Sequence, residues 1–196
     1  MFIEPISRED ATGELADLYE AEEDRWGFVP TFTQAFSHHP DAYRAWLGLI
    51  GVAYGSMDRR RCELATLAAA KALRSTCCSV AHGMFLRDLF YDNERVIRIA
   101  ENHREAGLEA VDVAIMDFAE KAATDPSTMT QADIDELRQH GLSEREIFEV
   151  AYAVAARAFF ATLIESLGAS AEEPMVATLD EDLLAALTVG RPASVA

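Results

Sequence analysis

The chain is poor in positive charge. Its 196 residues include 17 Lys and Arg against 34 Asp and Glu, which gives a formal net charge of −17 at pH 7. Binding to nucleic-acid phosphates requires a basic face, and an anionic membrane surface repels an acidic protein. We therefore expect neither a nucleic acid nor a membrane as a partner, and the charge mainly predicts good solubility.

Cysteine and long apolar runs are also scarce. The chain has three cysteines, two of them adjacent, which is a poor basis for a disulfide framework. No run reaches the ~18 uninterrupted apolar residues of a membrane span. Residues 1–10 do not show the basic and then apolar order of a secretory signal. These absences together predict a cytoplasmic protein.

Strand signals are missing as well. No segment of useful length alternates apolar and polar residues, and no Asn-Gly or Asp-Gly pair marks a hairpin turn. Half of the residues are apolar and 26% are charged, as in ordered globular proteins. The sequence predicts a single all-α domain over residues 1–196, with an N-terminal arm at about 1–26 and a C-terminal arm at about 169–196.

Helices are expected where apolar residues recur with a helical period. The expected ranges are about 8–25, 41–54, 61–73, 76–90, 93–104, 108–123, 130–140 and 143–168, with a short helix near Leu183. The segment 41–54 is almost continuously apolar and is expected to be buried, whereas residues 59–61, three arginines, are expected to lie in solvent. A loose likeness between two Ala-rich blocks, 63–89 and 146–167, allows a duplicated helical pair.

The stretch from Glu63 to His82 brings three reactive side-chain types together. Cys78 and His82 are four residues apart and share a helix face, while Glu63 lies on the preceding helix. Ser75 is a preferred N-cap residue, which places Cys78 in the first turn of a helix. A helix N-terminus supplies only ~0.3–1 kcal/mol of the ~2.7 kcal/mol that ionises most of a thiol at pH 7. We expect His82 to supply the rest and Glu63 to orient it.

This arrangement resembles the active-site signature of the alkylhydroperoxidase D-like, carboxymuconolactone decarboxylase superfamily, in its peroxidase-related branch. That signature is a Glu, an intervening helix and then Cys-x-x-Cys-x-x-x-His. Here Cys78 follows Glu63 by fifteen positions, and His82 follows Cys78 by four. Other matching segments extend the likeness over residues 27–168: Gly27-Phe28-Val29-Pro30, Glu63-Leu64, Ser79-Val80-Ala81-His82-Gly83, Gly141-Leu142-Ser143 and Glu146-Ile147.

The resemblance implies a helical bundle that acts as an antioxidant peroxidase, an oxidoreductase without a cofactor or a metal. By position, it makes Cys78 the peroxidatic thiol and makes Glu63 and His82 the proton relay. The first cysteine of the motif is Ser75 in this chain, and a hydroxyl cannot close a disulfide. The resemblance also implies a homo-oligomer, commonly a dimer, trimer or hexamer.

The loss of that first cysteine leaves the resolving step open. Cys77 is a secondary candidate, but neighbouring Cα atoms lie ~3.8 Å apart, below the usual disulfide range of ~4.4–6.8 Å. Cys62 is a remoter candidate that core packing explains equally well. We expect a small-molecule hydroperoxide as substrate and an external thiol as reductant. Two alternatives stay open: an acid–base enzyme like carboxymuconolactone decarboxylase, and a non-catalytic helical oligomer with a degenerate ligand pocket.

Overall fold

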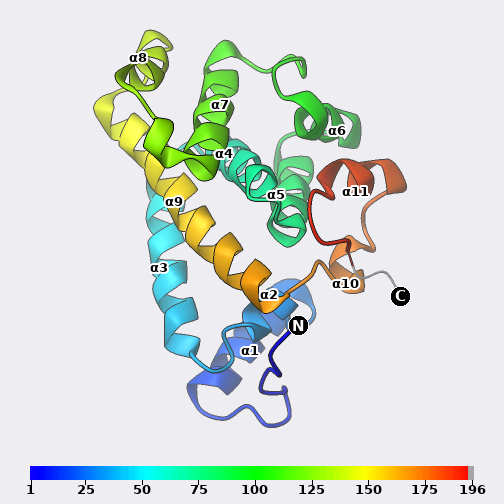
Figure 1. The fold of residues 1–196 in the computed structure, drawn as a ribbon. Coiled ribbons are helices and arrows are strands. Elements are labelled where there is room, and N and C mark those ends of the chain that lie inside the picture. The colour runs from blue at the N-terminus through cyan, green and yellow to red at the C-terminus, as the bar shows by residue number, and fades with distance from the viewer. Residues whose placement is uncertain (194–196) are drawn as a thin grey trace.

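The computed structural model describes residues 1–193, so residues 194–196 of the expected C-terminal arm lie outside it. The described chain contains α-helices, one short 3₁₀ helix and no strand, which confirms the all-α prediction (Figure 1). The helices are α1 (Glu14–Trp26), α2 (Thr31–Gln34), α3 (Pro40–Ser56), α4 (Arg59–Ala72), α5 (Thr76–Leu89), α6 (Asn93–Asn102), α7 (Ala110–Thr124), η1 (Pro126–Thr128), α8 (Gln131–Gln139), α9 (Glu144–Leu167), α10 (Glu173–Val176) and α11 (Glu181–Leu187).

The bundle is organised around α4. Every residue of this helix from Cys62 to Ala70 is buried. Its many alanines favour the helical state and let neighbouring helices approach closely. α5, α7 and α9 pack directly on α4, and α3 packs against α9 (Figure 1). Glu63 therefore lies inside the bundle, where a carboxylate without a partner is strongly unfavourable.

The predicted starts of α5, α8 and α9 are confirmed. Ser75 caps α5 by accepting a hydrogen bond from the backbone N–H of Cys78. The capping boxes at Thr130 and Ser143 are both formed and begin α8 and α9. α9 runs without a break to Gly168, whose φ of 75° lies in the left-handed region that glycine favours. The first Ala-rich block thus folds as two helices and the second as a single helix, so the two blocks differ.

Two helices depart from the sequence prediction in extent or burial. α1 begins at Glu14 rather than near residue 8, because Gly13 has a φ of 55° and interrupts the helical backbone. The prediction that the helix over 41–54 is buried was wrong for one of its faces. Tyr43 and Trp46 are buried there, but Val52 is 56% exposed.

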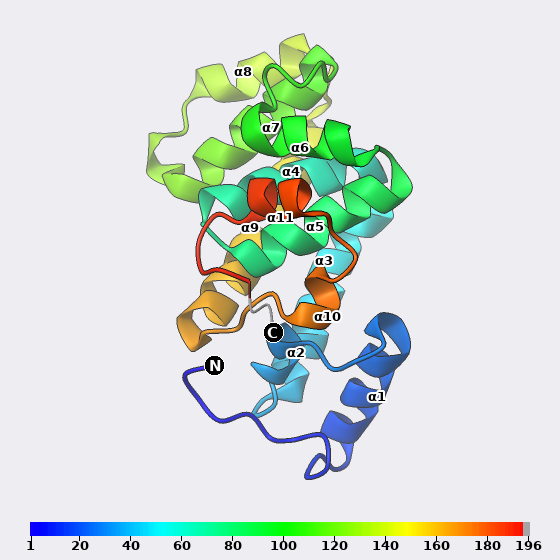
Figure 2. The ribbon, with the colours of Figure 1, turned by 90° about the vertical axis from the view of Figure 1, so that its right-hand side faces the viewer.

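The C-terminal segment is more deeply packed than an arm would be. Leu183 and Leu187 of α11 are fully buried, and α11 lies against α5 and α6 (Figure 2). Beyond α11, the backbone N–H groups of Val189 and Gly190 donate to Thr76 Oγ1 at 3.2 and 3.0 Å. These contacts cover the first turn of α5 from the outside.

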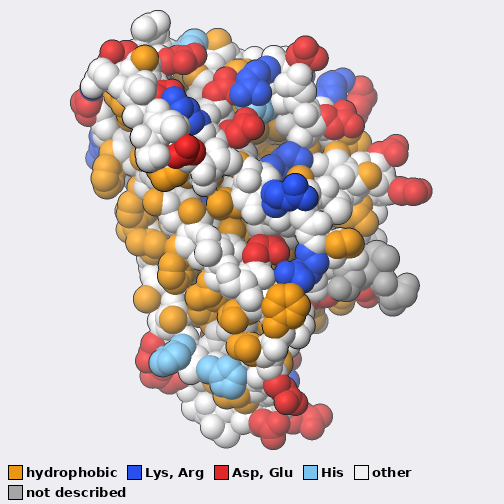
Figure 3. Space-filling model, in the orientation of Figure 1, with side chains coloured by type: hydrophobic (Ala, Val, Ile, Leu, Met, Phe, Trp, Pro, Cys, Tyr) orange, Lys and Arg blue, Asp and Glu red, His pale blue; other side chains and the backbone are white. Residues whose placement is uncertain are grey.

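Among residues 1–193, α9 is the one helix that is long and apolar enough to cross a membrane. More than half of its most apolar window, 56%, is buried inside the protein, as in the core helix of a soluble protein. Its outer side still exposes Phe148 and Phe159, and α3 exposes Leu49 and Val52. Figure 3 shows hydrophobic side chains gathered over these two helices.

Candidate active site

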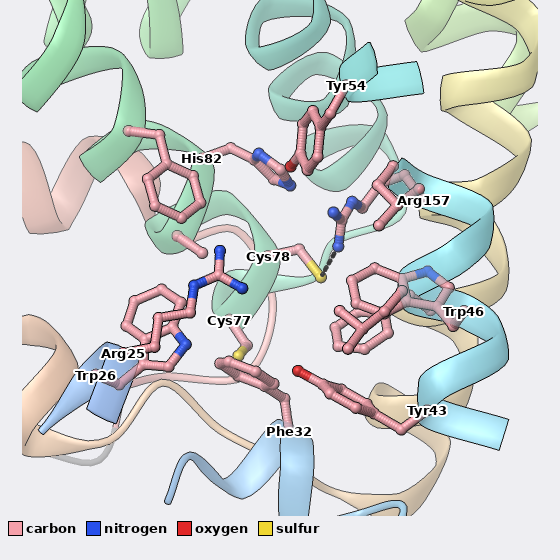
Figure 4. A pocket seen from close by; sticks show the side chains of 15 residues that line it. Arg25, Trp26, Phe32, Tyr43, Trp46, Tyr54, Cys77, Cys78, His82 and Arg157 are labelled. Carbon is pink, nitrogen blue, oxygen red and sulfur yellow. Dashed lines mark hydrogen bonds between the residues drawn. The ribbon is translucent and has the colours of Figure 1, made fainter. Parts of the chain in front are cut away.

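Cys78 lies in the first turn of α5, where the sequence places it, and its side chain borders a cavity (Figure 4). The residue is only 2% exposed. Its sulfur accepts a hydrogen bond from Nη1 of Arg157 on α9, with 3.6 Å between the two atoms. The guanidinium of Arg157 and the first turn of α5 thus meet at this sulfur.

His82 and Glu63 meet as the sequence predicts. His82 Nδ1 lies 2.5 Å from Glu63 Oε2 and 3.1 Å from the hydroxyl of Thr66, and both Glu63 and His82 are buried. The Thr66 hydroxyl itself donates to the carbonyl of Cys62 at 2.7 Å. The proton between His82 and Glu63 therefore resides on Nδ1, which leaves the lone pair of Nε2 free.

The charges around this pair define its protonation. Burial by itself would raise the pKa of Glu63, but the interaction with His82 and the guanidinium groups of Arg59 and Arg157 lower it below its usual range. Arg59 Nη2 lies 2.7 Å from the second carboxylate oxygen of Glu63. Burial, followed by the charge of Arg157, lowers the pKa of His82. An ionised Glu63 thus orients a neutral His82, which can act as a base through Nε2.

The cavity beside Cys78 has a volume of about 60 Å³ and is walled mostly by aromatic rings. One water needs roughly 10–15 Å³ of such volume, so the cavity has room for about four to six waters or for one small molecule of that size. Trp46 lies along one wall (Figure 4) and stacks on Phe160 with 3.9 Å between ring centroids. The complete lining is Arg25, Trp26, Phe32, Tyr43, Trp46, Leu47, Ile50, Tyr54, Cys77, Cys78, Ala81, His82, Phe85, Arg157 and Phe160.

The secondary candidates differ in their position relative to the cavity. Ser75 is buried, donates to Glu165 Oε1 at 2.8 Å and does not line the cavity. Cys77 lines it, but burial raises the pKa of its thiol well above the usual value. Burial also raises the pKa of Cys62 to about 12. All three cysteines are free, and burial disfavours the thiolate form of Cys62 and Cys77.

The three arginines at the start of α4 do not lie free in solvent as the sequence analysis expected. Arg60 and Arg61 both bind the buried carboxylate of Asp112, with distances of 2.5 and 3.1 Å. Arg59 pairs with Glu63. The prediction was wrong because two fully buried carboxylates, on α4 and α7, require cationic partners.

Arg157 and Arg59 are the site residues that the sequence analysis missed. Arg157 stands between Ala156 and Ala158 in an apolar stretch of α9, just as Glu63 stands in an apolar stretch of α4. A single charge in an apolar helical segment was the signal that singled out Glu63. The same criterion applied to α9 would have found Arg157.

No protein-family model matches the chain, and no curated protein does. A solved alkylhydroperoxidase AhpD core, an uncharacterized peroxidase-related protein from Ralstonia eutropha JMP134, superposes with a TM-score of 0.72 at 24% identity, covering 96% of this chain and 100% of that one. The chain has the AhpD-like fold.

Two further structures share the AhpD-like fold. An uncharacterized peroxidase-related protein from Silicibacter sp. TM1040 has a TM-score of 0.71 at 20% identity, covering 86% of this chain and 87% of that one. A Cys-to-Ala variant of the debrominase Bmp8, in complex with 2,3,4-tribromopyrrole, has a TM-score of 0.77 at 21% identity, covering 93% and 97%. The resemblance stated from the sequence is thereby confirmed for the AhpD-like fold.

Proposed function

We propose that the protein is a thiol-dependent hydroperoxide reductase with Cys78 as its nucleophile. The proposal rests mainly on the groups that surround the sulfur atom of Cys78. Cys78 Sγ lies at a helix N-terminus, accepts from the buried guanidinium of Arg157 and borders the same cavity as His82. The fold shared with peroxidase-related proteins supports the same activity.

In the first step, His82 Nε2 takes the thiol proton and the Cys78 thiolate attacks one peroxide oxygen. The O–O bond breaks, Cys78 becomes a sulfenic acid, and the second oxygen leaves as an alkoxide that takes the proton from His82 and departs as the alcohol. Arg157 stabilises the negative charge first on sulfur and then on the leaving oxygen. Glu63 keeps His82 in the tautomer that this proton transfer requires.

The second half of the cycle requires an external thiol. Ser75 cannot form a disulfide, and the protonated Cys77 is a poor nucleophile. One external thiol attacks the sulfenic sulfur and releases water, which leaves a mixed disulfide on Cys78. A second external thiol attacks this disulfide and restores the Cys78 thiol. A cytoplasmic location, where such thiols are abundant, fits this cycle.

A second candidate reaction is reductive dehalogenation of an aromatic compound. It is supported by the seven aromatic side chains around Cys78 and by the debrominase with the same fold. The thiolate would attack the halogen, the ring carbon would take a proton, and two external thiols would convert the sulfenyl halide to thiol, disulfide and halide. Supplying reduced protein with either an organic hydroperoxide or a bromoarene, and measuring alcohol against bromide release, separates the two reactions.

Replacing Arg157 with glutamine is expected to slow alkylation of Cys78 by iodoacetamide at pH 7 about tenfold, the equivalent of about 1.4 kcal/mol. The reason is that the variant removes the cation beside the sulfur. Mass spectrometry of the labelled Cys78 peptide over time gives the rate. Arg98→Gln, a change on α6 outside the cavity, is the matched control. An unchanged rate in the Arg157 variant would contradict the assigned role.

We also propose that the chain self-associates through the exposed apolar side chains of α3 and α9. Phe159 and Val52 are 48% and 56% exposed, and such patches typically mark interfaces. The double change Val52→Ser and Phe159→Ser is expected to reduce the mass measured by light scattering to that of a single chain. Leu89→Ser removes an equally exposed leucine from α5 and should leave the mass unchanged. A wild-type mass of one chain would refute the proposal.

A further inference from the structure

The charged groups that face the cavity all have the same sign. Although the chain contains 34 acidic residues, the described lining includes no Asp or Glu and two arginines, Arg25 from α1 and Arg157 from α9. Two buried carboxylates lie behind the lining: Glu63, which is bound by Arg59 and His82, and Glu22, which accepts a hydrogen bond from Thr33. Figure 4 shows both lining guanidinium groups directed toward the cavity from different sides. A strongly acidic protein thus presents a cationic ligand site.

Neither of these arginines has a carboxylate partner among residues 1–193. Arg157 is 4% exposed, and its Nε has no hydrogen-bond partner among the described residues. Its guanidinium donates to the Cys78 sulfur and lies over the rings of Trp46 and Phe160. Arg25 is exposed at the edge of the cavity and lies over the Trp26 ring at 5.4 Å. A buried guanidinium without an anion is unfavourable, so the site favours negative charge in its occupant.

The number of charges determines how much negative charge is required. Two guanidinium groups bring two positive charges, and the Cys78 thiolate of the proposed mechanism offsets one of them. His82 is neutral, so the lining carries one net positive charge. Arg157 contacts the sulfur directly, which leaves the exposed Arg25 guanidinium available to the ligand. One guanidinium pairs with one carboxylate in a bidentate contact, so the lining suits a monoanion.

The aromatic side chains that wall the cavity indicate the shape of the uncharged part of the ligand. The ring pair Trp26 and Phe32 meets edge to face at 5.7 Å on one side, and Trp46 and Phe160 stack on another. Flat rings favour a planar partner that stacks or packs edge-on against them. A short alkyl hydroperoxide would leave most of this aromatic surface uncovered.

We propose that the cavity binds a planar aromatic monoanion, such as an aryl carboxylate, with its charged group at Arg25 and its reactive substituent at Cys78. This inference rests on the proposed function only for the placement of the reactive substituent and for the thiolate in the charge count. The aromatic anion would be the carrier of the peroxide or halogen that Cys78 attacks.

The two tryptophans of the chain, Trp26 and Trp46, both line the cavity, so intrinsic fluorescence reports on ligand binding there. Titration of the reduced wild-type protein with benzoate, and separately with the isosteric neutral benzamide, measures the contribution of charge. We expect benzoate to bind at least tenfold more tightly than benzamide. We expect Arg25→Gln to abolish this preference and Arg98→Gln to keep it. Cyclohexanecarboxylate, an anion without a planar ring, should bind more weakly than benzoate.

Equal affinity for benzoate and benzamide, or no quenching by either up to millimolar concentration, would overturn the proposal. So would a benzoate preference that survives in Arg25→Gln, because the anion would then be held elsewhere. The titration uses no peroxide and no turnover. A protein that prefers benzoate but shows no peroxidase activity would therefore refute the proposed function and support the anion site. A protein that reduces hydroperoxide through Cys78 but shows no benzoate preference would support the proposed function and refute the anion site.

Discussion

A Cys78→Ser protein is expected to consume organic hydroperoxide at least about 10³-fold more slowly than the wild-type protein, as for removal of other catalytic nucleophiles. The hydroxyl is nearly the same size as the thiol, but it is not ionised at neutral pH, and its oxygen cannot be oxidised by a hydroperoxide as the thiol sulfur is to a sulfenic acid. The measurement is peroxide loss with dithiothreitol as the external thiol. Dimedone labelling followed by mass spectrometry should detect a sulfenic acid at residue 78 in the wild-type protein alone.

Cys77→Ser and Cys62→Ser are the matched controls, because both remove a buried thiol from the same region without touching the nucleophile. Both variants should retain most of the activity, since the external thiol performs the resolving step. A strong loss in Cys77→Ser would make Cys77 the resolving residue and contradict the single-cysteine cycle. Full activity of Cys78→Ser on a lactone acid would favour the acid–base decarboxylase reaction of Glu63 and His82.

The part of the site that could be predicted from the sequence is the part encoded by short spacings. A separation of four residues places Cys78 and His82 on one face of any helix, and a serine three residues before Cys78 marks the start of that helix. Both features depend on helix geometry alone, so they do not depend on how the bundle packs. The structure places these residues accordingly.

The partner of the Cys78 sulfur could not be predicted in this way. Arg157 is 79 residues away in the sequence and reaches Cys78 because α9 packs on α4. No local period encodes which helices become neighbours. A general rule would still have helped: a buried charge must have a partner, so the isolated charges Glu63 and Arg157 in two apolar helices belong near each other.

The burial of α3 shows a second limit of periodicity. A nearly continuous apolar segment predicts a helix, but it does not identify which face meets the core. α3 buries Trp46 and exposes Val52. The excess of apolar residues over what the core requires is therefore visible only in the structure, and it is the basis for the proposed self-association.

Replacing Glu63 with glutamine is expected to lower peroxidase activity by about 10²–10⁴-fold, by analogy with amide replacement of an orienting carboxylate in other enzymes. The side chain keeps its size but can present its NH₂ group to His82 Nδ1. His82 then carries its proton on Nε2, where it faces the cavity and cannot accept the thiol proton. The ¹⁵N chemical shifts of the imidazole should report this change of tautomer directly.

Stability and function must be separated in this variant, because Glu63→Gln also leaves the Arg59 guanidinium without its ion partner. Loss of one member of a buried pair destabilises proteins by roughly 3–5 kcal/mol, although Arg59 is 38% exposed in its side chain and its loss should be smaller. Arg59→Gln is the matched control: it breaks the same ion pair but keeps the His82–Glu63 hydrogen bond. Urea unfolding should show both variants folded and destabilised, while only Glu63→Gln loses most of its activity. Equal activity losses in the two variants would mean that Glu63 acts through the stability of the site rather than through the tautomer of His82.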